Sequence, residues 1–177
     1  MGCHHLTQIL LTFSAAALMI SLSSAVTQNI LYTICSQTQS EEICVRILES
    51  DPNTKSSTLP QLSLISINLT REQANKNYKI FRDLQANTTA GSLRRSYGKC
   101  SRIYKQMIDK INDAYQLSQL GRYEDIHQLG QAQTLAYNCE NGLPSNSTTA
   151  ADTESMILTC EAAASVNLYI ASSIPES

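Results

Sequence analysis

The fold is decided by residues 34–52, ICSQTQSEEICVRILESDP. The stretch contains two cysteines, Cys35 and Cys44, and the residues around them are typical of short helices. We expect these helices at 29–35 and 41–50, separated by a polar turn. The stretch therefore predicts a helical hairpin, which a bond between the two cysteines would clamp.

The second of these helices has a start signal and a stop signal. Ser40 stands where an N-cap residue would begin the helix, and Glu41 and Glu42 place carboxylates in its first turn. We interpret these glutamates as helix-start electrostatics and not as an acid–base pair. The helix should end before Pro52, because proline disfavours helical geometry in the residue that precedes it.

The first 25 residues have the three parts of a signal peptide. A short n-region precedes an apolar stretch at 9–22, which is too short to span a bilayer, since spanning takes about 20 residues. Ser23 and Ala25 supply small residues at the cleavage site. We expect cleavage after Ala25 and a secreted mature chain, residues 26–177, of single-domain size; a signal anchor is the alternative.

Secretion makes disulfides the expected state of the cysteines. The chain has six cysteines, and removal of Cys3 with the leader leaves five, so one stays single or pairs between chains. Cys160 lies on an apolar stripe, and we interpret it as a small buried hydrophobic residue with a free thiol.

Three sequons, at Asn68, Asn87 and Asn146, predict N-glycosylation. The last two fall in predicted loops, whereas Asn68 lies in a helical pattern and needs an exposed face.

Four longer segments have the periodicity of amphipathic helices. We expect the first at 58–85, the third at 123–140 and the fourth at 152–172, while the second ends at Leu120 with Gly121 as its C′ residue. The predicted core stripe of the first helix is Leu62, Ile65, Leu69, Lys76, Ile80 and Leu84, with Ala74, Tyr78 and Phe81 alongside. That of the second is Tyr97, Cys100, Tyr104, Met107, Ile111, Ala114 or Tyr115, and Ser118.

Short connections between long helices favour antiparallel neighbours. We therefore predict an all-α fold, an up-down-up-down four-helix bundle preceded by the N-terminal helical hairpin. No later stretch of the chain is apolar enough to cross a membrane.

Composition and motifs argue against several functions. The net charge is −2 with both signs scattered, so we expect no nucleic-acid partner. Arg94 and Arg95 are interpreted as solvated residues at a helix start.

A nucleophile elbow, a His-Glu-x-x-His motif and a phosphate-binding glycine loop are all missing from the sequence. His127 is the one histidine of the mature chain, and we expect it to be a solvated residue. The sequence thus predicts a protein that is not an enzyme and has no metal site or cofactor.

Several motifs together resemble the plant invertase and pectin methylesterase inhibitor family. Its opening is similar to Ile34-Cys35, Cys44 and Glu49-Ser50-Asp51-Pro52 of this chain. Its second and third long helices resemble the segments that carry Tyr97, Cys100, Tyr104, Leu120-Gly121, Tyr123 and Cys139-Glu140. Cys160 lies where the family has its usual free thiol. The resemblance covers essentially the whole mature chain.

The resemblance implies disulfides Cys35–Cys44 and Cys100–Cys139. It also implies a secreted inhibitor in the plant cell wall, or apoplast, that acts as a monomer. Such an inhibitor blocks the active-site cleft of a carbohydrate-active enzyme in a 1:1 complex, mainly through its second and third long helices. Because the chain ends at Ser177 after its last predicted helix, we expect the domain to stand alone and not to precede an enzyme.

The resemblance favours pectin methylesterase as the target over acid invertase. Family members that inhibit invertase often carry a Pro-Lys-Phe stretch where this chain has 91–93, Gly-Ser-Leu. Pectin methylesterase inhibitors tend to carry acidic residues on the outer side of the second long helix. Asp109 and Asp113 match that pattern, while Arg102 and Gln106 occupy neighbouring positions. These four are the predicted partner-binding residues. Two further hypotheses stay open, a family member that has lost inhibition and a helical carrier of lipids.

Overall fold

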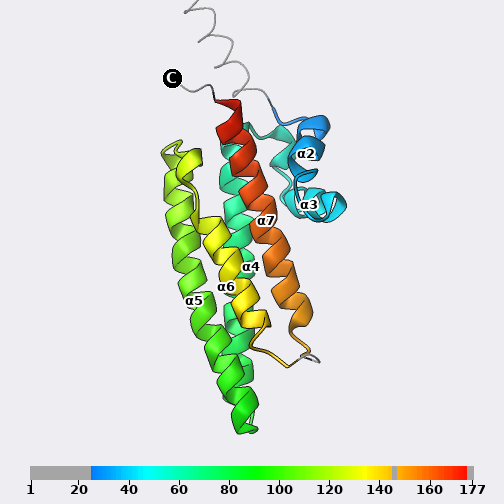
Figure 1. The fold of residues 1–177 in the computed structure, drawn as a ribbon. Coiled ribbons are helices and arrows are strands. Elements are labelled where there is room, and N and C mark those ends of the chain that lie inside the picture. Colours follow the sequence, from blue (N-terminus) through cyan, green and yellow to red (C-terminus); the bar gives the residue numbers. More distant parts are fainter. Residues whose placement is uncertain (1–24, 145–146, 175–177) are drawn as a thin grey trace, which may run out of the picture.

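The computed structural model describes residues 25–144 and 147–174, which form six α-helices and two 3-10 turns (Figure 1). The helices are α2 (Gln28–Cys35), α3 (Glu41–Leu48), α4 (Leu59–Asn87), α5 (Gly91–Gln119), α6 (Gln128–Glu140) and α7 (Ala150–Ser173), and the turns are Thr54–Ser56 and Tyr123–Asp125. Except for Ala25, the predicted signal peptide lies outside the described residues.

The four long helices pack as an up-down-up-down bundle. Each of them contacts the next one along the chain, and α7 closes the bundle by contacting α4. The α2–α3 hairpin packs outside the bundle against α7, where α3 also reaches α4 (Figure 1). The predicted fold class, a four-helix bundle preceded by a helical hairpin, is confirmed.

Local sequence signals explain the start of α4 and the end of α5. At the start of α4, the Thr58 backbone N–H donates to Gln61 Oε1 at 2.8 Å, as part of a capping box. At the end of α5, Gly121 has a φ of 70°, which a residue with a Cβ rarely adopts. The Arg122 N–H then donates back to the Leu117 carbonyl at 3.0 Å, as in a Schellman motif.

The predicted end of α3 and the predicted start of α6 are wrong. Helix α3 ends at Leu48, two residues early. Ser40 stands at its N-cap position, as predicted, although its side chain makes no hydrogen bond to the helix. Helix α6 begins at Gln128 instead of at residue 123. The residues Tyr123–Asp125 form a 3-10 turn, and Ile126 then has a ψ of 70°, so the backbone leaves helical geometry before α6 starts.

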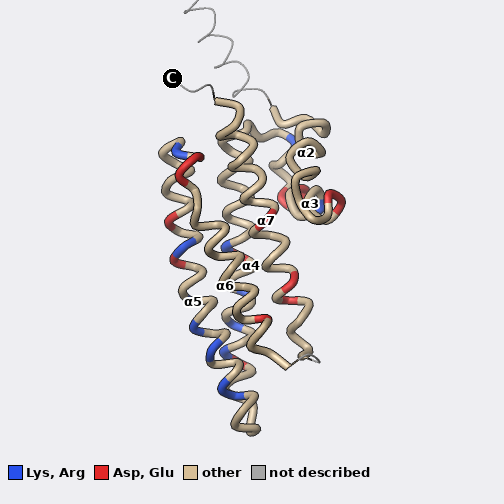
Figure 2. Tube along the Cα trace, in the orientation of Figure 1, with Lys and Arg blue, Asp and Glu red and all other residues tan. Residues whose placement is uncertain are grey.

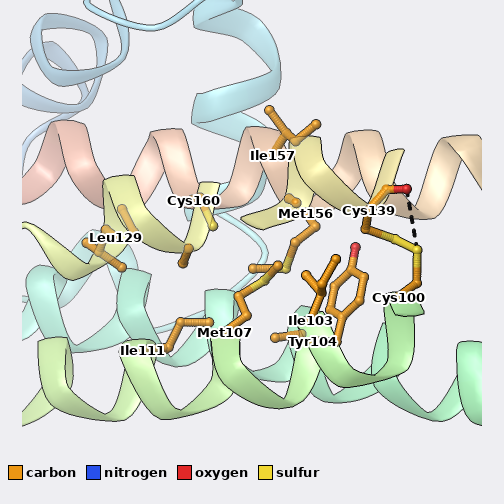
Figure 3. Close-up of a cluster of buried hydrophobic side chains, with 14 of the residues drawn as sticks. Cys100, Ile103, Tyr104, Met107, Ile111, Leu129, Cys139, Met156, Ile157 and Cys160 are labelled. Carbon is orange, nitrogen blue, oxygen red and sulfur yellow. Dashed lines mark hydrogen bonds between the residues drawn. A yellow bond between two sulfur atoms is a disulfide. The ribbon is translucent and has the colours of Figure 1, made fainter. Parts of the chain in front are cut away.

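Two disulfides brace the structure. Cys35–Cys44 joins α2 to α3 with a Cα–Cα distance of 5.5 Å, and Cys100–Cys139 joins α5 to α6 with a Cα–Cα distance of 4.9 Å (Figure 3). Cys160 on α7 is buried and carries a free thiol. Burial raises the pKa of this thiol, so it stays protonated and unreactive.

The two longest helices differ in how well the sequence predicts their buried faces. On α5 the buried residues include every member of the predicted stripe, with Ala114 and not Tyr115 at the ambiguous position. On α4 most of the predicted stripe is wrong: Ile65, Leu69, Ile80 and Leu84 are half-buried, and Lys76 is exposed. The interior positions of α4 include four polar residues instead, Ser63, Ser66, Thr70 and Asn77.

Candidate protein-binding surface

The four residues predicted to bind a partner lie on one exposed stripe of α5. Arg102, Gln106, Asp109 and Asp113 are spaced by four, three and four residues, which places them on one helix face, and all four are exposed. The opposite face of α5 carries the buried stripe. The structure therefore brings all four together on the outside of the bundle, in what we call the α5 stripe.

A groove between α5 and α6 extends this stripe. It has a volume of about 470 Å³ and is lined by Gln106, Asp109, Lys110, Gln131, Thr134 and Leu135. The three lining residues from α6 were not predicted from the sequence, because the acidic pattern concerns the outer face of α5 alone. They supply the residues of α6, the third long helix, that the family resemblance implied without identifying.

The disulfide between α5 and α6 could have identified these α6 residues. It joins Cys100 to Cys139, and the two helices run antiparallel. Gln106, six residues after Cys100, therefore lies level with a point six residues before Cys139. That point falls between Gln131 and Thr134, where the structure places the groove.

The α5 stripe changes charge along its length. Arg102 lies nearer the amino-terminal end of α5, and Asp109 and Asp113 lie nearer its carboxyl-terminal end. None of the four takes part in the three ion pairs found among the described residues. Their charges are therefore available to a partner, since no internal pair has to be broken first.

The other predicted sites are dispersed over the molecule. Asn68 is half-buried on α4, where its Oδ1 accepts a hydrogen bond from Arg71 Nη2 at 2.7 Å. Asn87 is exposed and is the last residue of α4, not a loop residue. Asn146 lies outside the described residues. His127 is exposed at the N-cap position of α6.

Metal-binding and membrane-spanning features can be assessed within residues 25–144 and 147–174. In these ranges no group of three or more His, Cys, Asp or Glu side chains is arranged to hold a metal ion. No helix there combines the length and the apolar character needed to cross a bilayer.

Charges are segregated, and the expectation that both signs are scattered is wrong. Residues 76–105 hold eight of the 13 Lys and Arg residues but one of the 15 Asp and Glu residues, Asp83. They form the second half of α4 and the first half of α5, which meet at one end of the bundle (Figure 2). The remainder of the chain is correspondingly acidic. A small net charge thus conceals a strongly basic end.

These features define a disulfide-braced helical bundle with an accessory hairpin and an exposed two-helix face. The sequence model of the family described as plant invertase/pectin methylesterase inhibitor matches residues 29–170. The chain belongs to this family of enzyme inhibitors.

Two curated relatives agree with the family match. A pectinesterase inhibitor of Actinidia deliciosa is 30% identical over 99 residues, which cover 56% of this chain and 54% of the relative. Pectinesterase inhibitor 2 of Arabidopsis thaliana is 25% identical over 83 residues, 47% of this chain and 48% of the relative. The chain thus spans about half the length of each of these relatives.

Two solved structures share the fold. Mutant form A of a pectin methylesterase inhibitor from Arabidopsis has a TM-score of 0.69 at 19% identity, covering 78% of this chain and 95% of that one. A pectin methylesterase inhibitor from Arabidopsis thaliana has a TM-score of 0.61 at 18% identity, covering 86% and 100%. At such low identities these likenesses establish the bundle with its hairpin and nothing further.

Proposed function

We propose that this protein inhibits a pectin methylesterase by forming a 1:1 complex in which α5 and α6 cover the active-site cleft of the enzyme. The family membership and the names of both curated relatives support this target. The observation that carries the proposal for this chain is the exposed α5 stripe, which continues into the groove beside α6.

The inhibition is steric. The Cys100–Cys139 bond ties together the two helices that form the proposed contact face, and that face lies on a packed core. A surface that is already ordered loses little conformational entropy when it docks, so more of the contact energy remains as affinity. The groove offers a recess for a side chain of the enzyme, flanked by the carboxylate of Asp109.

The proposal includes a compartment and a processed form. Residues 1–25 form a signal peptide, and residues 26–177 are the mature inhibitor domain, secreted to the apoplast as a monomer. The match to the family sequence model begins at residue 29, close to the proposed cleavage site. Glycans are attached at Asn87 and Asn146, and at Asn68 where its side chain can leave its contact with Arg71. The intact mass of protein secreted by plant cells, before and after deglycosylation, tests the cleavage site and the presence of glycans.

The direct test adds purified, oxidised mature protein to a pectin methylesterase and, separately, to an acid invertase. Slowed methanol release from pectin, with glucose release from sucrose unaffected, supports the proposal. The opposite pattern would identify an invertase inhibitor. If neither enzyme is slowed, the chain has kept the fold and lost inhibition.

A pair of matched variants tests the contact face. The double change Asp109→Lys and Asp113→Lys should weaken inhibition of the pectin methylesterase strongly. The control is Glu42→Lys with Glu154→Lys, which makes the same change in net charge at exposed residues of α3 and α7. If the two double variants inhibit equally well, the α5 stripe is not the contact face.

A further inference from the structure

The basic end of the bundle carries an exposed surface that the proposed inhibition leaves largely unused. Of the eight basic residues there, Lys76 pairs with Asp152 at 3.7 Å. The other seven are all exposed, and none has an ion-pair partner among the described residues. We call these seven the basic surface: Lys79, Arg82, Arg94, Arg95, Lys99, Arg102 and Lys105.

Part of the basic surface surrounds a pocket of about 440 Å³. The pocket is lined by Gln85, Gly91, Arg94, Arg95, Gly98 and Arg102, and so lies between the end of α4 and the start of α5. Gly98 is buried here, and a Cβ at this position would stand 2.8 Å from Gln85 Nε2. The glycine therefore lets the Gln85 amide lie directly on α5. Three arginines and one glutamine thus line a single recess.

Guanidinium groups are suited to one kind of ligand. They bind carboxylates and phosphates through paired N–H donors, and they do not lose their charge at any physiological pH. Arg95, Lys99 and Arg102 also follow one another along α5 at spacings of four and three residues, so they extend about 10 Å along one face. A row of this length fits a linear polymer with repeated negative charges better than a single small anion.

We infer that the basic surface binds a carboxylate-bearing polysaccharide, namely the de-esterified pectin that the proposed target enzyme produces. This choice rests on the proposed function, because hydrolysis of each methyl ester consumes one water and releases methanol and a proton, which leaves a carboxylate on the polymer. The product of the target enzyme is thus a polyanion formed where the inhibitor acts. Binding to this polymer raises the local concentration of the inhibitor around the enzyme, because a second binding site holds it nearby.

The surroundings of the basic surface do not favour the other polyanions. Single-stranded nucleic acids need exposed aromatic rings on which bases can stack. At this end Phe81, Tyr97 and Tyr104 are buried, and the half-buried Tyr78 packs against the core with Arg82 over its ring at 5.9 Å. Lipid surfaces are bound by basic helices that also expose large apolar side chains. The exposed large hydrophobic residues within the described ranges all lie outside residues 76–105: Tyr32, Leu120, Tyr137, Leu168 and Ile174.

The test measures binding of the oxidised mature protein to immobilised polygalacturonate and to fully methyl-esterified pectin, which share a backbone and differ in charge. Every variant carries Asn87→Gln, because a glycan at Asn87 would lie beside the basic surface. Binding to polygalacturonate is expected to weaken steeply with added salt, as counterion release requires, and the esterified polymer should not bind. A single-stranded DNA of equal charge should bind more weakly.

A matched pair of variants locates the site. Arg94→Gln with Arg95→Gln should reduce polygalacturonate affinity at least about tenfold and should flatten its dependence on salt. Arg46→Gln with Lys55→Gln removes the same charge from the hairpin end of the molecule and should leave the affinity within about twofold. Equal losses in the two variants, tighter binding to the DNA, or equal binding to both pectins would overturn the inference.

The same variants separate this inference from the proposed function. Arg94 and Arg95 are not among the four residues of the α5 stripe, and Arg95 lies about 10 Å beyond Arg102 along the helix axis. Their double variant should therefore still inhibit a pectin methylesterase assayed on a small soluble ester. Inhibition without any binding to polygalacturonate would refute the polysaccharide site alone. Polygalacturonate binding at the Arg94 and Arg95 site without inhibition would refute the proposed function while supporting a polyanion site.

Discussion

Helices α4 and α5 are both 29 residues long and lie side by side, yet they bury different kinds of surface. Helix α5 buries the apolar residues that recur along it every three or four positions. Helix α4 turns several of its apolar residues towards the rim of the bundle and turns polar ones inward. Periodicity thus identifies the buried face of a helix when that face is apolar, and it fails when the interior is held by hydrogen bonds.

Two of the inward polar residues of α4, Ser63 and Asn77, bond to both neighbouring helices. Ser63 Oγ lies 2.6 Å from Ser118 Oγ of α5 and donates to Asn167 Oδ1 of α7. Asn77 Nδ2 donates to the Tyr104 hydroxyl at 3.0 Å and to the Asp152 carbonyl of α7 at 2.7 Å. A buried polar group costs stability when it lacks a partner. Each of these bonds therefore favours a single orientation of α4 about its own axis, the one that turns Ser63 and Asn77 inward.

The largest difference between the two helices should appear when the same side chain is truncated in each. Ile111→Ala on α5 removes a residue with no exposed surface and should cost about 2–5 kcal/mol of the free energy of unfolding. Ile65→Ala on α4 removes the same atoms from a half-buried position and should cost about 1 kcal/mol. Urea unfolding with the disulfides intact measures both. Equal costs would mean that Ile65 contributes to the core as Ile111 does, as the periodicity of α4 predicts.

The free energy of unfolding should depend on alkaline pH through the buried hydroxyl of Tyr104 on α5, which bonds to Asn77 of α4. Burial raises the pKa of Tyr104 from 10.0 to about 12, although its hydrogen bonds with Asn77 and Thr153 act to lower it. The folded protein therefore holds this proton more tightly than the unfolded chain does. This contribution to stability is complete below pH 10 and is lost as the pH rises towards 12.

The expected loss over that range is roughly 2–3 kcal/mol relative to Tyr104→Phe. Unfolding by urea at several alkaline pH values measures it, with Cys160→Ala in both proteins so that no thiolate attacks the disulfides. If the two proteins lose stability in parallel, Tyr104 is not the group responsible.

The hydrogen bonds of Asn77 should contribute the next largest effect. Asn77→Leu keeps a similar volume but leaves the Tyr104 hydroxyl and the Asp152 carbonyl without this partner, which should cost about 1–3 kcal/mol. In the double variant with Tyr104→Phe, the cost should be smaller than the sum of the two single costs, because both changes break one bond. Strict additivity in thermal or urea unfolding would mean that the bond does not couple the helices.

The smallest predicted difference compares two neighbouring serines of α4. Ser63→Ala removes contacts to both α5 and α7 and should cost about 1 kcal/mol. Among the described residues, Ser66 Oγ donates only to the Ser63 carbonyl of its own helix, at 2.8 Å, so Ser66→Ala should cost no more than a few tenths of a kcal/mol. A larger cost for Ser66 would show that bonds within α4, and not those between helices, hold its inner face.

Much of the fold was predictable because its signals are local. Gly121 marks the end of α5, and Cys35 with Cys44 marks the hairpin. The start of α6 was not predictable, because Ile126 belongs to the apolar pattern of a helix while its backbone follows the preceding turn. The inner face of α4 was missed for a further reason: the partners that satisfy Ser63 and Asn77 are distant in sequence.

The candidate surface was predicted in part. The α5 stripe follows from the family resemblance together with helical spacing, whereas Thr134 and Leu135 of α6 join it only through tertiary packing. The basic surface was missed because the net charge of the whole chain, −2, sums a basic region and an acidic remainder that nearly cancel. The distribution of charge along the chain would have revealed it, since residues 76–105 contain a single acidic residue.

The central claim, that α5 and α6 cover the target enzyme, is tested most directly by hydroxyl-radical footprinting of the complex with a pectin methylesterase. Leu135 lies in the groove between these helices, and Leu168 is 65% exposed on α7. The account predicts that complex formation slows the oxidation of Leu135 and leaves that of Leu168 unchanged. Protection of Leu168 with no change at Leu135 would contradict it.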